Sequence, residues 1–71
     1  MNKGTLRELI ISKYGSLKSF DKEFSFENGY CETTICKGDN MSLEDVENFI
    51  VALNLNETQI NDIFLRNKVE F

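Results

Sequence analysis

The sequence contains no histidine, no tryptophan and no proline, and only two of its 71 residues are cysteines. The absence of histidine removes the commonest general base and the commonest metal ligand together. Because a zinc site needs about four ligands, two cysteines without histidine leave such a set incomplete. We therefore expect no metal, no cofactor and no small-molecule substrate, and we interpret Cys31 and Cys36 as reduced thiols of a cytoplasmic protein.

Long apolar segments are missing as well. No apolar run approaches the roughly 20 residues that a membrane-spanning helix requires, and the first residues lack the pattern of a signal peptide. A chain this short forms one domain, which we place at residues 1–71. Carboxylate pairs such as Glu44 with Asp45 have neither a base nor a metal set beside them. We interpret these pairs as solvated helix faces and expect no enzyme activity.

Charge is distributed unevenly along the chain. The formal net charge of −4 argues against indiscriminate binding to nucleic acid. Residues 1–37 carry six basic and five acidic side chains, whereas residues 38–71 carry two basic and seven acidic ones. A protein that docks on phosphate would present the first part and turn the second part away. The same pattern is typical of acidic residues on the exposed faces of C-terminal helices.

Apolar residues recur at helical spacing in four segments, which predict helices over 5–14, 17–24, 43–53 and 57–66. Their apolar stripes define one expected core, and truncation inside it would cost most of the stability of so small a domain. The predicted core residues are Leu6, Leu9, Ile10, Phe20, Val46, Phe49, Ile50, Leu53, Ile60, Ile63 and Phe64.

Residues suited to cap helices stand at the ends of these segments. Ser, Thr and Asn side chains accept hydrogen bonds from the first unpaired amides of a helix, and Gly or Asn adopts the left-handed conformation that ends one. The predicted caps are Thr5 with Glu8, Ser16, Ser42 and Asn56 with Gln59 at N-termini, and Gly15 and Asn54 at C-termini.

Two structures compete for residues 25–40. In one, a helix extends over 28–37; in the other, Asn28-Gly29 forms a type I′ turn of a β-hairpin at about 24–35. The tyrosine, threonines and isoleucine that follow the turn favour strands, whereas an isolated hairpin is only marginally stable. The expected fold is therefore an all-α bundle of four to five short helices, or alternatively an α+β fold that includes the hairpin.

Four stretches of the chain carry a family resemblance. They are LRELI at 6–10, YGSLKSF at 14–20, MSLEDV at 41–46 and IVALNL at 50–55. In helix lengths and apolar spacing, the chain resembles the small helix-turn-helix proteins of the Cro and phage-repressor class, as found in phages and prophages. The resemblance implies a transcriptional regulator that acts in a repressor switch and binds operator DNA through a helix-turn-helix.

This resemblance implies a recognition helix at about 28–37. Outward side chains of such a helix pair with base edges, and the start of the preceding helix lies beside the phosphate backbone. Glu32 is expected on or near the same face, where its carboxylate would repel phosphate. The DNA-binding residues implied in this way are Ser16, Lys18, Asn28, Tyr30, Thr33 and Lys37.

Two positions depart from the family pattern. The family usually has a small residue where this chain has Asp21, and a glycine where it has Ser25. An aspartate where two helices normally touch implies either a shifted helix pair or an exposed Asp21. Both departures favour an alternative function, a degenerate helix-turn-helix modulator that binds a partner repressor protein instead of DNA. Its expected partner-binding residues are Phe26, Glu27, Tyr30 and Glu32.

The sequence leaves a homodimer open. The last residues, 69–71, could pair across a dimer or fold back on the core.

Overall fold

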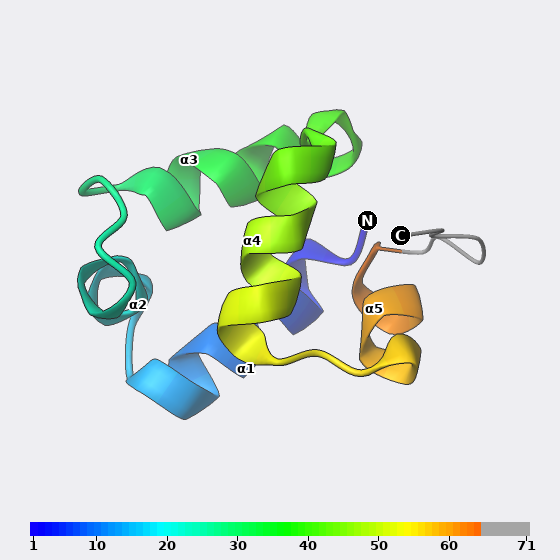
Figure 1. The fold of residues 1–71 in the computed structure, drawn as a ribbon, viewed down its shortest axis with the longest axis horizontal. Coiled ribbons are helices and arrows are strands. Elements are labelled where there is room, and N and C mark those ends of the chain that lie inside the picture. Colours follow the sequence, from blue (N-terminus) through cyan, green and yellow to red (C-terminus); the bar gives the residue numbers. More distant parts are fainter. Residues whose placement is uncertain (65–71) are drawn as a thin grey trace.

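A computed structural model of the protein describes residues 1–64. Within that range the chain forms five α-helices and one short 3₁₀ helix, and it contains no strand. The helices are α1 (Lys3–Tyr14), α2 (Leu17–Glu23), α3 (Tyr30–Lys37), η1 (Gly38–Asn40), α4 (Leu43–Leu53) and α5 (Glu57–Phe64) (Figure 1).

The all-α prediction is confirmed, and the alternative hairpin at about 24–35 is wrong. Asn28-Gly29 does form a turn, and Gly29 has a positive φ of 85°, but the turn begins a helix instead of joining two strands. Burial explains the outcome. Thr34 and Ile35 favour strands in isolation, yet on α3 both side chains are buried, and tertiary packing overrides a weak local preference.

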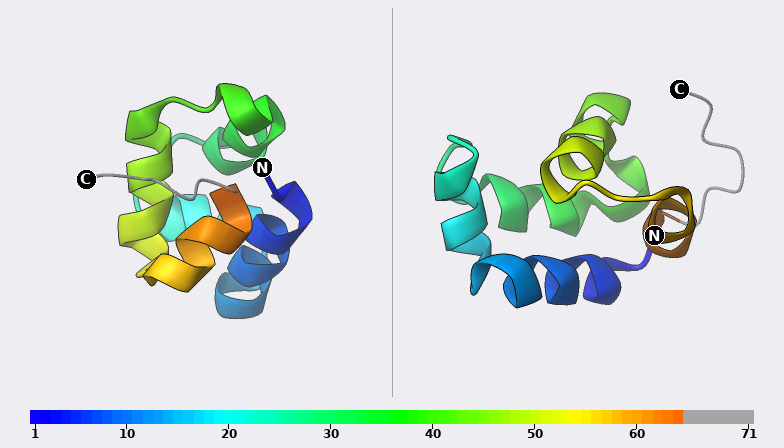
Figure 2. Two further views of the ribbon diagram at one scale, coloured as in Figure 1. Left: turned by 90° about the vertical axis from the view of Figure 1, so that its right-hand side faces the viewer. Right: turned by 60° about the horizontal axis from the view of Figure 1, so that its bottom comes forward.

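The short helix α2 connects α1 to α3 at one end of the molecule. The helix α4 crosses in front of α1 and α3 in the view of Figure 1 (Figures 1 and 2). The helix α5 packs beside the start of α1, where the backbone N–H of Asn2 donates to the carbonyl of Ile63 at 2.6 Å. The helix α2 and the start of α3 sit at the end of the molecule farthest from α5 (Figure 1).

One core fills the space between the helices. Most of the predicted core residues are fully buried, while Leu9, Ile50 and Ile60 are half-buried at its margin. Buried hydrophobic residues that the periodicity did not predict are Cys31, Ile35, Met41 and Leu55. The first two belong to α3, the segment whose structure the sequence left open.

Aromatic side chains attach the short helix α2 to the rest of the core. The ring of Phe20 lies with its centroid 5.4 Å from that of Tyr14 on α1 and 5.9 Å from that of Phe49 on α4. Phe24 and Phe26, which follow α2, pack on the same ring at 5.0 and 5.8 Å. Because α2 has only two turns, these contacts rather than its own hydrogen bonds determine its position.

Most predicted caps are confirmed. Ser16 and Ser42 accept hydrogen bonds from the backbone N–H of Ser19 and Asp45, and Asn56 and Gln59 bond reciprocally. Gly15 ends α1 with a φ of 87°, and Asn54 ends α4 in the left-handed conformation. The prediction for Thr5 is wrong, because α1 begins earlier. Asn2, an equally strong capping residue, accepts the hydrogen bond from the Thr5 N–H.

The predicted helix 57–66 is confirmed as far as Phe64, and its last two positions lie outside the described residues. The suggestion about residues 69–71 also falls outside them.

Candidate nucleic-acid interface

A buried carboxylate joins the two helices of the candidate interface. Asp21 on α2 is only 3% exposed, and its Oδ1 accepts a hydrogen bond from the backbone N–H of Cys31 at 3.0 Å. The first amides of a helix lack intrahelical partners and carry partial positive charge, so a carboxylate stabilises them. The expectation of an exposed Asp21 is therefore wrong. Asp21 replaces a simple small-residue contact with a cap on the neighbouring helix.

Burial raises the pKa of the Asp21 carboxyl above its ordinary value, while hydrogen bonds from the backbone N–H groups of Cys31 and Gly29 act in the opposite direction. The backbone of Asp21 takes part as well, since its carbonyl accepts from the N–H of Phe26 at 2.8 Å. Side chain and backbone of one residue thus determine how the chain leaves α2 and enters α3.

Residues 25–28 make the turn between the caps of α2 and α3, Phe24 and Gly29. This length matches the three- to four-residue turn of a helix-turn-helix. Ser25 has a φ of 58°, in the left-handed region that favours glycine, at the position where the resembled family usually has glycine. Ser25 therefore holds a backbone conformation that glycine adopts more easily.

Two lysines of α2 flank this turn. Lys18, Lys22 and Asn28 line a shallow depression of about 280 Å³, whose wall includes the ring of Phe26 (the buried Asp21 also contributes). Lys18 and Lys22 are one helical turn apart. Among residues 1–64 neither ammonium has a hydrogen bond or ion pair, so both are available to an anion.

The other cations of the first 37 residues are already engaged. Their partners are Cys36 O for Lys3, Glu32 for Arg7, Leu53 O for Lys13 and Asp45 for Lys37. Sequence reasoning named both lysines as possible phosphate contacts, and their spacing of four residues on one helix indicates that the two side chains share a face.

A second depression, of about 190 Å³, runs along α3 from the turn before it to its last residue. Its lining includes Glu27, Asn28, Thr33 and Lys37, which are all exposed. Asn28 lines both depressions, so the polar surface of α3 is continuous with the lysines of α2. The structure thus brings together five of the six residues predicted to contact DNA, which are Lys18, Asn28, Tyr30, Thr33 and Lys37.

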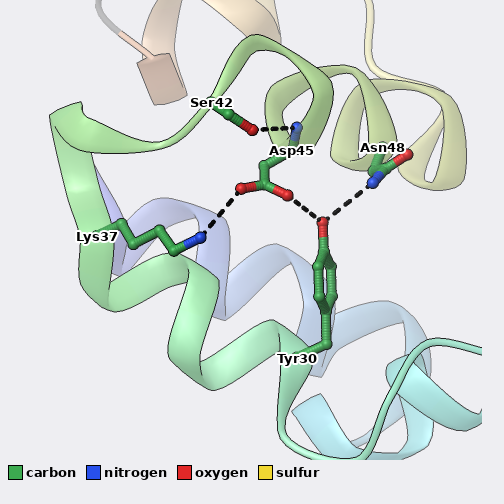
Figure 3. A network of polar contacts seen from close by, with 5 residues as sticks. All are labelled: Tyr30, Lys37, Ser42, Asp45 and Asn48. Atoms are coloured by element: carbon green, nitrogen blue, oxygen red, sulfur yellow. Dashed lines mark hydrogen bonds and ion pairs between the residues drawn. The ribbon is translucent and has the colours of Figure 1, made fainter.

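Tyr30 lines the same depression, but its hydroxyl is directed to α4 (Figure 3). Its hydroxyl donates to Asp45 Oδ1 at 2.8 Å and accepts from Asn48 Nδ2 at 3.1 Å. Burial raises the pKa of this hydroxyl, and the nearby Asp45 carboxylate adds to the rise. The ring of Tyr30 also packs on Phe26, with centroids 4.6 Å apart. Tyr30 therefore connects α3 to α4, and its polar atom is used within the protein.

Ser16 is likewise engaged within the chain. Its Oγ accepts the hydrogen bond from the Ser19 N–H that caps α2, and it also lies 3.0 Å from the Ser19 hydroxyl. Ser16 caps the N-terminus of α2 as predicted, and its hydroxyl is therefore used within the chain.

Glu32 does not line the depression that contains Thr33 and Lys37. Its carboxylate bonds to Arg7 of α1 at 3.1 Å, so it lies toward α1. Glu32 was expected on or near the face of Thr33, and its carboxylate is directed to α1 instead of into the depression that Thr33 lines. Of the residues predicted to bind a partner, Phe26, Glu27 and Tyr30 lie close together and Glu32 lies apart from them.

Two residues of the site, Asp45 and Asn48, were not anticipated. Both lie on α4 and approach α3 only in the folded chain, and no spacing in the sequence links them to Tyr30.

Comparison of the chain with protein-family models, with curated proteins and with solved structures found no match. No helix within residues 1–64 is long and apolar enough to cross a membrane.

Proposed function

We propose that the protein is a small phage-type transcriptional regulator that acts in a repressor switch and binds operator DNA through α2 and α3. The observation that carries the proposal is the pair of unengaged lysines, Lys18 and Lys22, on the helix that precedes exposed polar residues of α3. In a helix-turn-helix, the second helix enters the major groove while the first crosses the backbone.

Lys18 and Lys22 supply the phosphate contacts in this proposal. Contacts of Lys with phosphate provide most of the affinity of a DNA-binding protein, independently of sequence. Both side chains lie on one side of α2, next to Asn28 in the same depression. A DNA strand along this depression would meet both ammonium groups without breaking an existing ion pair.

Asn28 and Thr33 supply the base contacts. An Asn side chain pairs with N6 and N7 of adenine, and a Thr methyl packs on the thymine methyl group. Both residues are exposed, and both line the depression that runs along α3. Residues near the N-terminal end of a recognition helix are the ones that contact base edges. The hydrogen bond from the Tyr30 hydroxyl to Asp45 holds α3 against α4.

Glu27 favours a second candidate function, a modulator that binds a basic repressor protein through the same face. Its carboxylate is exposed in the depression beside Asn28 and Thr33, where it would repel phosphate and attract a cationic partner. The half-buried ring of Phe26 lies next to it and offers apolar surface.

Selection of binding sites from a pool of random-sequence DNA duplexes tests the first function. We expect enrichment of a discrete site that contains an adenine or thymine step. Thr33→Ala and Asn28→Ala should narrow the affinity ratio between the selected and the random duplex. Thr58→Ala, at an exposed threonine on α5, should leave the ratio unchanged.

Glu27→Gln separates the two candidates. Removal of this carboxylate should tighten DNA binding under the first function, and it should weaken binding to a basic repressor under the second. Absence of any enriched sequence, together with saturable binding to a neighbouring repressor, would replace the first function with the second.

A further inference from the structure

One carboxylate on α4 contacts α3 near both of its ends. Asp45 Oδ1 accepts the hydroxyl of Tyr30, the first residue of α3, at 2.8 Å. Asp45 Oδ2 lies 3.4 Å from the ammonium of Lys37, the last residue of the same helix. Figure 3 shows the carboxylate between these two side chains.

The carboxylate of Asp45 is held in this position by several contacts. Its side chain is only 14% exposed, and Tyr30 is itself fixed by Asn48 at 3.1 Å. The hydroxyl of Ser42 accepts the backbone N–H of Asp45, which fixes the first turn of α4. Partial burial disfavours ionisation of Asp45, but hydrogen bonds from Tyr30 and Ser42, together with Lys37, lower its pKa overall. Asp45 is therefore a fixed anion at neutral pH.

Lys37 is consequently unlike Lys18 and Lys22. Its ammonium is directed to α4, whereas theirs have no partner among residues 1–64. An ion pair as exposed as this one is worth little by itself and would not hold Lys37 against a phosphate. The position of Asp45 adds a second effect. When Lys37 leaves, the carboxylate stays, and a phosphate that approaches the end of α3 meets its negative charge.

We propose that Asp45 competes with DNA phosphate for the Lys37 ammonium, so that Lys37 makes no phosphate contact in the native protein. The inference rests on the proposed function and concerns the regulation of the same interface. The protein then binds DNA through fewer cations than its sequence contains. Asp45 keeps binding to arbitrary DNA weak and leaves a larger share of the affinity to base contacts at Asn28 and Thr33.

Asp45→Asn tests the proposal, because the amide oxygen still accepts the Tyr30 hydroxyl while the charge is removed. The probe is a fluorescein-labelled pool of 20-base-pair random-sequence duplexes, titrated by anisotropy between about 50 and 200 mM KCl. Each phosphate contact adds about −0.9 to the slope of log K against log salt. We expect Asp45→Asn to steepen the slope by about 0.9 per chain and to tighten binding about 3- to 10-fold at the low-salt end.

Lys37→Ala provides the second arm. In the native background it should leave the slope unchanged, and in the Asp45→Asn background it should cancel the gain. This arm decides the matter even if Asp45→Asn fails to fold. A slope flattened by about 0.9 on Lys37→Ala alone means that Lys37 already contacts phosphate, and it overturns the proposal.

Glu47→Gln is the matched control. Glu47 is exposed on α4, and two residues along a helix place it on the side opposite Asp45, so the variant makes the same change in net charge elsewhere. An equal gain from Glu47→Gln would assign the effect to net charge and overturn the proposal. Wild-type binding that Asp45→Asn leaves unchanged would overturn it while sparing the proposed function. Absence of DNA binding by every variant would remove both.

Discussion

The carboxylate of Asp21 accepts the backbone N–H of Cys31 at 3.0 Å, and this hydrogen bond couples α2 to the first turn of α3. Both residues are buried, so the bond is shielded from water. In the family that the chain resembles, a small residue lets the two helices touch at this position. In this chain the buried Asp21 carboxylate joins the two helices by capping α3. The orientation of the candidate recognition helix α3 therefore depends on this hydrogen bond.

The stability contribution of Asp21 should depend on pH in an unusual direction. Because burial raises its pKa in the folded state, the folded protein binds a proton more tightly there than the unfolded chain. The contribution of Asp21 should therefore fall as pH rises from about 4, the ordinary Asp value, through the raised pKa. Urea denaturation of the wild type and Asp21→Asn between pH 4 and 7 measures it. A wild-type advantage that grows with pH would contradict the burial argument.

Ser25→Gly should stabilise the protein. Ser25 has a φ of 58°, where a residue with a Cβ loses about 1–2 kcal/mol, and glycine recovers this at an entropic cost of about 0.5–1 kcal/mol. We expect a net gain of about 0.5–1 kcal/mol in the free energy of unfolding. Ser12→Gly, at an exposed helical position of α1, should instead lose about 0.5 kcal/mol. Equal effects at both sites would show that the turn is not strained.

Phe49→Ala should come close to unfolding the domain. Phe49 is fully buried and stacks between Phe20 and Tyr30, with centroids 5.9 and 6.2 Å away. Loss of the ring should cost about 3–5 kcal/mol, a large part of the total stability of a small domain. Val51→Ala, on the same helix but 79% exposed, should change stability by less than about 0.5 kcal/mol. Circular dichroism during urea unfolding compares the two variants.

The two cysteines should react at very different rates. Cys36 is exposed on α3, whereas Cys31 is buried, and burial with the nearby Asp21 and Glu32 charges raises the pKa of its thiol to about 12. Since the thiolate is the reactive form, a thiol-specific chromogenic reagent should label one cysteine in the native protein. The second should react only after unfolding in urea. Rapid labelling of both thiols would show that α3 is not packed as described.

The helices could be predicted where local signals agreed. Over 43–53 the apolar spacing, the cap at Ser42 and the left-handed Asn54 all indicate one helix, and the structure has it with those bounds. Over 25–40 the local signals disagreed, because several residues of α3 prefer strands in isolation whereas an isolated hairpin is only marginally stable. Only the burial of Cys31 and Ile35 against the core, a property of the whole fold, decides for the helix.

The candidate site could be predicted in part for a similar reason. Exposure of Asn28 and Thr33 follows from helical periodicity once α3 is accepted. The direction of the Tyr30 hydroxyl toward α4 does not, because it depends on Asp45 and Asn48 of α4, which approach Tyr30 only after the helices pack. Asp21 lies at the contact between two helices, and the alternative of an exposed Asp21 is wrong. The free amides of α3 offset part of the cost of burying its carboxylate.

The salt dependence of DNA binding by Lys18→Gln/Lys22→Gln tests the central claim most directly. If these two lysines hold the phosphate backbone, the double variant should lose about 1.8 from the magnitude of the slope of log K against log salt per chain, at about 0.9 for each contact. Lys13→Gln, whose ammonium bonds to Leu53 O, should leave the slope unchanged. Equal slopes for the wild type and the double variant would contradict DNA binding through α2 and α3.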